Sequence, residues 1–335
     1  MACWYKEADK VGDIIISSRV RLARNLSDLP FPRRMNDDMF IQLKARVKKA
    51  IDEIAATGDL KLKFIEMNAV PENEINAMVE RHVISPDFAR NYHDRAIAIS
   101  DDESVSVMIG EEDHIRIQVI YGGMALDKAY ELADCLDTAL NEKLGFAYDN
   151  QLGFLTECPT NIGTGLRASV MLHLPVCESS GQIAAVSDAA GKIGLTVRGM
   201  YGEGSKAGAS LYQISNQITL GISEENAISN LKVIAEQIVD REKAARASLD
   251  IKELEDAVFR AYGTLKYARL LNSEEFMKLI SMIKLGINMG IIEKDTIRPI
   301  ELLIIAQPGM LQKSFSVMSP RERDEARAEM VRNMI

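Results

Sequence analysis

Apolar and polar residues follow two different periods up to about residue 220. In residues 37–56 the apolar positions recur at spacings of three and four, which predicts an amphipathic helix that ends at Gly58. Residues 125–144 predict a second long helix, which Gly145 terminates. Short β-branched or alternating runs predict strands, and these lie at 14–16, 61–67, 95–100, 104–109, 114–120, 151–155, 167–174, 194–198 and 209–215.

The order of these elements indicates the type of sheet. Many predicted strands follow one another without a helix between them, and several have one apolar and one polar face. Parallel strands need a crossover connection, which is usually a helix, whereas antiparallel strands do not. We therefore expect an α/β (α+β) fold, with a largely antiparallel sheet flanked by helices that cover one of its faces.

The pattern becomes helical after about residue 222. Ser223 caps a helix that continues to Ala247, and the last helix begins with a capping box formed by Ser319 and Glu322. Further helices are predicted at 251–271, 273–285 and 298–306. We expect two domains: a catalytic domain over 1–247 and a small all-α domain over 248–335.

Composition and charge narrow the class of protein. Of the 335 residues 47% are hydrophobic and 27% are charged, values typical of a globular protein with a substantial core. Lys and Arg number 40 and Asp and Glu 49, a net charge of −9 that argues against direct nucleic-acid binding. A local basic patch for a small polyanion remains compatible with this balance.

The sequence gives no sign of membrane insertion, secretion or a structural metal. No apolar run is long enough to span a bilayer, and the first ten residues do not form a signal peptide. The four cysteines and four histidines show no metal-ligand spacing. We expect a cytoplasmic protein with neither disulfides nor a dedicated metal site.

Four segments combine residues that packing alone does not require. In 17–25 three arginines follow an apolar strand, although an edge strand with a solvated basic face is an equally good interpretation. In 110–116 three acids precede an arginine, and strand alternation places Glu112, His114 and Arg116 on one face. The alternative for this second segment is a charged turn.

The other two segments are rich in glycine. Residues 157–167 contain Cys158 in a turn with two glycines that permit close approach of the backbone, and a buried small hydrophobe is the alternative for this cysteine. In 198–205 an arginine and Glu203 flank a glycine-rich loop, for which a flexible turn is the alternative. No Walker A or protein-kinase motif is present. Converging arginines indicate a polyphosphate ligand, and two glutamates indicate a cationic acceptor.

These motifs resemble those of the phosphagen (guanidino) kinases, the creatine and arginine kinase family. The similarity lies in 158–165, 111–114 and 17–21, which occur here in the family's order. The chain lacks the family's helical N-terminal domain and adds a helical C-terminal domain. In both respects, and in 198–203 and 323–328, it is similar over its whole length to the bacterial protein-arginine kinases.

The resemblance implies ATP-dependent phosphorylation of arginine side chains in proteins, with Mg²⁺ carried by the nucleotide. It implies Glu112 and Glu203 as the two carboxylates that face the acceptor, and Cys158 beside the acceptor guanidinium. Of the two carboxylates we favour Glu112 as the base and Glu203 as the orienting partner. Met171 stands where the family has a histidine near the adenine. The nucleotide site would comprise Ser17, Ser18, Arg19, Val20, Arg21, His82, Arg116, Arg167, Ala168, Ser169, Val170, Met171, Arg198, Gly199, Met200, Tyr201, Gly202 and Glu203.

The C-terminal motif implies a second site. The capping box places 323–328 on a helix, where Arg323 and Arg327 lie one turn apart. An exposed helix with ion pairs is the simpler interpretation, whereas the resemblance implies allosteric binding of phosphoarginine. The residues of this motif are Arg323, Asp324, Glu325, Ala326, Arg327 and Ala328.

The resemblance also implies partners. These are protein substrates with exposed arginines, a small zinc-binding activator, a heat-shock repressor and a Clp chaperone-protease, and the C-terminal helices could pair in a homodimer. Two other functions stay open. A small-molecule guanidino kinase lacks support because the N-terminal domain that encloses a small substrate is missing. An inactive phosphoarginine-binding protein would not need Glu112 and Glu203.

Overall fold

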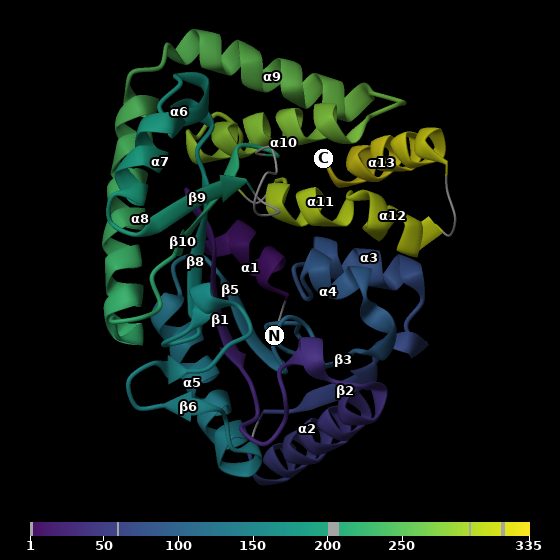
Figure 1. Ribbon diagram of the computed structural model, residues 1–335. Coiled ribbons are helices and arrows are strands. Elements are labelled where there is room, and N and C mark those ends of the chain that lie inside the picture. Colours follow the sequence, from purple (N-terminus) through teal and green to yellow (C-terminus); the bar gives the residue numbers. More distant parts are fainter. Residues whose placement is uncertain (1–2, 59, 200–207, 295, 316–318) are drawn as a thin grey trace.

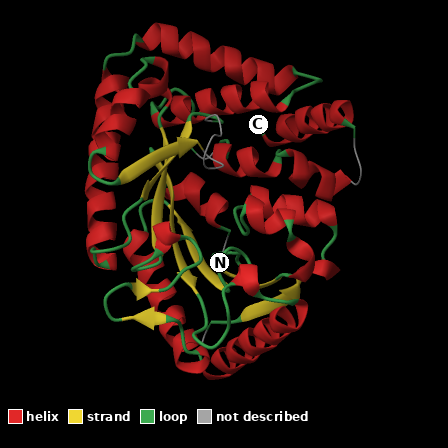
Figure 2. Cartoon of the chain, viewed as in Figure 1, coloured by secondary structure: helices red, strands yellow, loops and turns green. Residues whose placement is uncertain are grey.

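The core of the protein is one antiparallel sheet. The computed structural model describes residues 3–58, 60–199, 208–294, 296–315 and 319–335. Within these residues eight strands pair in the order β2-β3-β4-β5-β1-β8-β10-β9, every neighbouring pair antiparallel (Figures 1 and 2), which confirms the predicted fold class. The strands are β1 (Ile15–Arg24), β2 (Leu62–Glu66), β3 (Ala96–Ser100), β4 (Val105–Ile109), β5 (Ile115–Gly122), β8 (Leu166–His173), β9 (Leu195–Gly199) and β10 (Leu211–Asn216); β6 (Tyr148–Asp149) and β7 (Gly153–Phe154) form a separate hairpin.

One face of the sheet carries the main hydrophobic core. The helices on it are α2 (Asp37–Thr57), α5 (Leu126–Leu144), α7 (Ile183–Gly191) and α8 (Glu224–Ala247). The strands contribute alternate apolar side chains to this core, among them Val20, Leu22 and Val119, which are at most 1% exposed. The predicted helices 37–56 and 125–144 are confirmed, and Gly145 adopts the left-handed conformation expected of a glycine that ends a helix.

The opposite face is covered only in part. Short helices that the sequence pattern did not predict lie there: α1 (Trp4–Val11), α3 (Glu72–Glu80) and α4 (Pro86–Arg90). A second apolar cluster joins Trp4 of α1, Ile16 of β1 and Ile120 of β5 to residues of the C-terminal helices. The expectation of helices on one face alone is therefore wrong, and the uncovered part of this face holds the cavity described below.

The C-terminal part is helical, as predicted. Its helices are α9 (Ile251–Tyr267), α10 (Ser273–Asn288), α11 (Pro299–Ile305), α12 (Pro308–Phe315) and α13 (Pro320–Met334), which lie together in Figure 1. The capping box at the start of α13 is confirmed by reciprocal bonds of Ser319 and Glu322. α9 ends at Tyr267 rather than at the predicted residue 271. The segment after it lies along α13, where the Leu271 amide donates to the Asp324 carbonyl and the Leu271 carbonyl accepts from Arg327.

The division into two domains stays a prediction. α8 ends at Ala247 and α9 begins at Ile251, which matches the expected boundary. α1 nevertheless shares its apolar cluster with the C-terminal helices, and Asp9 in α1 accepts hydrogen bonds from the first amides of α11 at Ile300 and Glu301. Within the described residues, no helix combines the length and apolar composition needed to cross a bilayer.

Candidate active site

Strand pairing places the arginines of several motifs on one face of the sheet. β1 lies between β5 and β8, so the edge-strand interpretation of 17–25 is wrong. Arg21 stands opposite Arg167 of β8 and Gln118 of β5, and Arg198 of β9 stands opposite Gln213 of β10. Directly opposed residues point to the same side of a sheet, so these guanidinium groups form one array.

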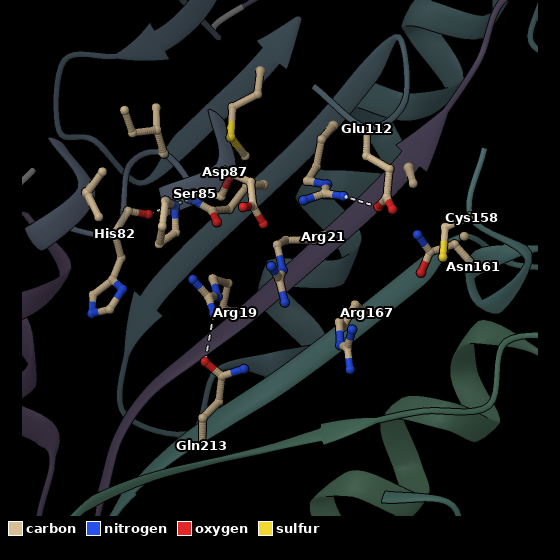
Figure 3. A pocket seen from close by; sticks show the side chains of 18 of the residues that line it. Arg19, Arg21, His82, Ser85, Asp87, Glu112, Cys158, Asn161, Arg167 and Gln213 are labelled. Atoms are coloured by element: carbon tan, nitrogen blue, oxygen red, sulfur yellow. Dashed lines mark hydrogen bonds and ion pairs between the residues drawn. The ribbon is translucent and has the colours of Figure 1, made fainter. Parts of the chain in front are cut away.

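This array forms the floor of a cavity of about 470 Å³, the nucleotide cavity (Figure 3). His82, Ser85 and Asp87, which lie on or between α3 and α4, form one wall. Glu112 and Cys158 also line it, and in Figure 3 both lie on the side away from His82. The arginines that line it are Arg19, Arg21, Arg90, Arg116, Arg167 and Arg198.

The electrostatics of the cavity favour an anionic ligand. Burial, with the charges of Arg167 and Arg116, lowers the pKa of Arg19 to about 10. The pKa of Arg21 is also well below its usual range, first because of burial and then because of Arg19 and Arg116. The Nε of Arg21 is buried without a hydrogen-bond partner among the described residues. Phosphate oxygens would supply both the missing acceptor and the opposing charge.

His82 is a neutral component of the wall. Burial and the nearby charges of Arg19 and Arg21 lower its pKa to about 3, so the ring carries no charge at neutral pH. Its carbonyl oxygen accepts a hydrogen bond of 2.7 Å from Gln118 Nε2, which holds the segment after α3 against β5. A neutral ring on an arginine-lined wall suits contact with a ligand's uncharged part.

Glu112 is held at the other end by Arg116. The Arg116 guanidinium lies 2.6 Å from Glu111 and 3.2 Å from Glu112. Glu111 is buried and also accepts a hydrogen bond from the Ser85 hydroxyl, whereas the side chain of Glu112 is 42% exposed and lines the cavity. Arg116 thus aims the Glu112 carboxylate, and Glu111 fixes Arg116.

Cys158 lies near this carboxylate end rather than in a core. It is partly exposed, lines the cavity and has its Sγ 3.1 Å from Thr160 Oγ1, so the buried-hydrophobe interpretation is wrong for this cysteine. The predicted place of His114 beside Glu112 and Arg116 is also wrong. β5 begins only at Ile115, so strand alternation does not extend back to 112–114, and His114 is buried against Leu26 and Pro30.

Several predicted nucleotide residues point elsewhere. Ser18, Val20, Ala168 and Val170 face the opposite side of the sheet and are completely buried. Ser17, Ser169 and Met171 line a small recess that shares Arg19 and Gln213 with the nucleotide cavity. Gly199 ends β9, and Met200, Tyr201, Gly202 and Glu203 lie outside the described residues.

The two glycines after Cys158 lie against other segments of the protein. Gly165 has φ +62°, and a Cβ there would lie 2.6 Å from Arg24 Nη1 and 2.7 Å from the Ala23 carbonyl oxygen. Arg24, the third arginine of the 17–25 motif, is 2% exposed and pairs with Asp137 at 2.9 Å. It also donates to the Thr164 carbonyl. Arg24 therefore fixes this turn, and of the three arginines in its motif Arg19 and Arg21 are the ones that line the cavity.

Sequence reasoning missed several lining residues. Gln118 and Gln213 continue the alternation that includes Arg116 and the polar face of β10, and that period could have identified them. Ser85 caps α4 by accepting from the Phe88 amide, which brings Asp87 to the rim. A serine, a proline and an acid in succession signal such a start.

The C-terminal motif is only partly accessible. Arg327 is 1% exposed; its Nε donates to the Ala306 carbonyl, and its Nη1 donates to the Leu271 carbonyl and to Asp324. The expectation that Arg323 and Arg327 together clamp a phosphate is therefore wrong for Arg327. Arg323 and Asp324, by contrast, are partly exposed.

The described residues offer phosphate ligands but no metal cage. Among them no three His, Cys, Asp or Glu side chains are grouped so as to hold a metal ion. An array of guanidinium groups instead matches the oxygens of a polyphosphate, which brings its own divalent cation into a kinase site.

The sequence matches two family descriptions. Residues 42–245 match "ATP:guanido phosphotransferase, C-terminal catalytic domain", and residues 251–335 match "Protein-arginine kinase McsB C-terminal domain". The chain is 45% identical over 340 residues to a protein named protein-arginine kinase from Moorella thermoacetica, covering 99% of this chain and 97% of the relative. Another protein of that name, from Halothermothrix orenii, is 45% identical over 328 residues, covering 96% of this chain and 93% of the relative.

Solved structures show the same fold. A duplicated taurocyamine kinase from Schistosoma mansoni superposes with a TM-score of 0.64 at 27% identity, over 70% of this chain and 34% of that one. Lombricine kinase superposes with a TM-score of 0.63 at 23% identity, over 76% of this chain and 74% of that one. The described sheet and its helices are thus those of the guanidino-kinase catalytic domain.

Proposed function

The chain belongs to the ATP:guanido phosphotransferase family, and we propose that it is a protein-arginine kinase, which transfers the γ-phosphoryl group of ATP to arginine side chains of proteins. The observation that carries this proposal is that an array of arginines lines the same cavity as Glu112 and Cys158. The arginines suit the triphosphate, and the carboxylate suits a guanidinium acceptor.

Arg19, Arg21, Arg116, Arg167 and Arg198 are proposed to hold the phosphates. Charge on a transferring phosphoryl group spreads over its equatorial oxygens, so positioned cations supply most of the stabilisation. Mg²⁺ bound to the nucleotide neutralises part of the phosphate charge. Because the arginines are fixed by adjacent strands, they need little rearrangement when the phosphates bind.

Glu112 is proposed to act as the base on the acceptor. A free guanidinium is protonated at neutral pH and is a poor nucleophile. Glu112 takes one N–H proton as that nitrogen bonds to the γ-phosphorus, the bond from phosphorus to the bridging oxygen breaks, and ADP leaves. Glu203, outside the described residues, is proposed to orient the same guanidinium, and Cys158 to align it without forming a covalent bond.

A transfer assay tests this function against its two alternatives. The protein is incubated with Mg-ATP and either free arginine or a mixed protein substrate, and products are analysed by mass spectrometry at mild pH, because the N–P bond is acid-labile. A protein-arginine kinase phosphorylates the protein. Transfer confined to free arginine would identify a small-molecule guanidino kinase, and phosphoarginine binding without any transfer would identify an inactive binding protein.

The partners and the second site rest on the resemblance to protein-arginine kinases. We propose a zinc-binding activator, a heat-shock repressor substrate and a Clp chaperone-protease as partners, with a homodimer and a cytoplasmic location. The proposed phosphoarginine site involves Arg323 and Asp324, with Arg327 holding their helix in place. Calorimetry with free phosphoarginine tests it: Arg323→Ala/Asp324→Ala should bind less than wild type, and equal binding would show that the segment is only structural.

A further inference from the structure

A second cavity of about 420 Å³ adjoins the nucleotide cavity. We propose that this acceptor groove, lined by Glu157, Arg33 and Asn91 as well as shared residues, binds the polypeptide on either side of the acceptor arginine, and that Glu157 positions it. The proposal rests on the proposed function and names the place where its protein substrate docks. The groove lies within the size range of small-ligand pockets.

The position of the groove suits the acceptor. Asp87, Glu112 and Arg116 line both cavities, so Glu112 stands in the wall between them. In an in-line displacement the acceptor approaches from the side opposite the leaving group. If the arginine array holds the nucleotide, a guanidinium that contacts Glu112 enters from the groove, and the chain that carries it lies there.

Glu157 is a carboxylate with an unused hydrogen-bond site. Its side chain is 16% exposed, and its Oε1 lies 3.5 Å from Nε of Arg33, a side chain that is 84% exposed. Its Oε2 is buried and has no hydrogen-bond partner among the described residues. Burying a carboxylate oxygen without a donor is unfavourable, so a donor from a bound polypeptide would satisfy it.

The backbone at Glu157 is fixed by a buried network. Its amide donates to Asp113 Oδ1 at 2.7 Å, and the same oxygen accepts from Asn25 Nδ2 at 2.6 Å. Asp113 is 1% exposed and Asn25 is equally buried. The backbone from which the Glu157 side chain extends is therefore fixed before a ligand arrives, which limits where the carboxylate can lie.

Charge indicates which polypeptides fit. Four carboxylates line the groove, from Asp87, Glu111, Glu112 and Glu157, against three guanidinium groups. Arg116 forms ion pairs with Glu111 and Glu112, and Nη1 of Arg95 donates a hydrogen bond to the Asp87 backbone carbonyl. Among the described residues, the Glu157 carboxylate thus has only the long contact with Arg33. We expect it to favour acceptor sequences with lysine or arginine next to the phosphorylated residue over those with glutamate there.

Measurements of KM with three acceptors test the groove. The acceptors are a short peptide with a central arginine flanked by lysines, a peptide in which glutamates replace those lysines, and N-acetylarginine amide, which has no flanking residues. Glu157→Ala should raise KM for the lysine-flanked peptide about tenfold, the loss expected for one charge-assisted hydrogen bond. KM for ATP and for N-acetylarginine amide should stay within about twofold, because neither reaches Glu157.

Two further variants control for folding and surface charge. Glu157→Gln keeps the shape and an acceptor oxygen, so its KM should lie between those of wild type and Glu157→Ala. Glu142→Ala removes an exposed carboxylate of α5 that lines neither cavity, and its KM values should equal those of wild type. Matching thermal unfolding of all variants shows that the fold is kept.

The result that overturns the proposal is an unchanged peptide KM in Glu157→Ala, or an equal rise for N-acetylarginine amide. Failure of the proposed function is separate: wild type would then transfer phosphate to none of the three acceptors. Fluorescence anisotropy of a labelled lysine-flanked peptide still tests the groove in that case. Binding that Glu157→Ala weakens about tenfold supports the groove, and equal binding refutes it.

Discussion

Removing Arg21 should stabilise the unliganded protein and weaken ATP binding. Its guanidinium stands opposite that of Arg167 in the sheet, near Arg19 and Arg116, and its Nε lacks a partner among the described residues. In the absence of an anion these like charges repel one another. Arg21→Met keeps much of the aliphatic stem that packs between the strands and removes only the charge.

The size of both effects follows from the sheet geometry. Adjacent strands lie about 5 Å apart, and two unit charges about 5–8 Å apart repel by roughly 2–3 kcal/mol at an effective dielectric constant near 20. Solvent in the open cavity screens part of this, which leaves a gain of about 1–2 kcal/mol. For a domain of this size that gain raises Tm by roughly 2–8 °C. Loss of one charged hydrogen bond should weaken ATP binding about 10- to 100-fold.

Differential scanning calorimetry with and without Mg-ATP measures both quantities. Wild type at 100 times its Kd should gain about 2.7 kcal/mol from ATP, and Arg21→Met at the same concentration much less. Arg260→Met on α9, where the side chain is 78% exposed, is the control and should change neither value. If unliganded Arg21→Met melts below wild type, or ATP stabilises both equally, the charge-repulsion argument is refuted.

Four further predictions concern single residues. Glu112→Gln should lose about 10²–10⁴-fold in transfer rate, measured with a protein substrate, while its Kd for ATP stays within about twofold. Cys158→Ala should slow transfer without abolishing it, and mass spectrometry should detect no phosphocysteine. Arg327→Ala should lower the free energy of unfolding by about 2–6 kcal/mol, because it leaves two buried carbonyl oxygens without a donor, whereas Arg323→Ala should cost far less in the same denaturant titration. The pKa of His82 is about 3 in the folded protein and 6.5 in the unfolded chain. Its contribution to stability is therefore complete above pH 6.5 and is lost on acidification. His82→Gln should reduce the loss of stability between pH 6 and 4 by up to about 1.4 kcal/mol per pH unit.

Periodicity predicted the long elements well because their burial is one-sided. The helix at 37–56 and the strand at 114–120 each show one apolar face, and each is found within two residues of its expected bounds. The alternation of polar and apolar residues shows which face of a strand is polar, however, and not whether that face meets bulk solvent or a ligand cavity. The arginines of β1 resemble a solvated edge in the sequence, although the strand is central and its polar face forms the cavity floor.

Residues in connecting segments escaped prediction because tertiary contacts place them. Asp87 lies in a helix of five residues that Ser85 caps, and this helix is too short for a periodic signal. In the sequence Glu157 is only the first residue of the segment 157–167, and its place in the groove depends on a buried network from Asp113. The segments 110–116 and 157–167 drew attention to Glu112 and Cys158, and the resemblance assigned their roles. The strand register explains how their cavity comes to be lined with arginine.

The packing of α1 has a consequence for synthesis on the ribosome. α1 packs against α11, shares its apolar cluster with residues of α9, α10, α11 and α13, and caps α11, which begins near residue 300, through Asp9. At a translation rate of about 5–20 residues per second, these partners emerge roughly 15–60 s later. Until then the part of α1 that packs on α11 stays uncovered, which makes the nascent chain a candidate for chaperone binding over that interval.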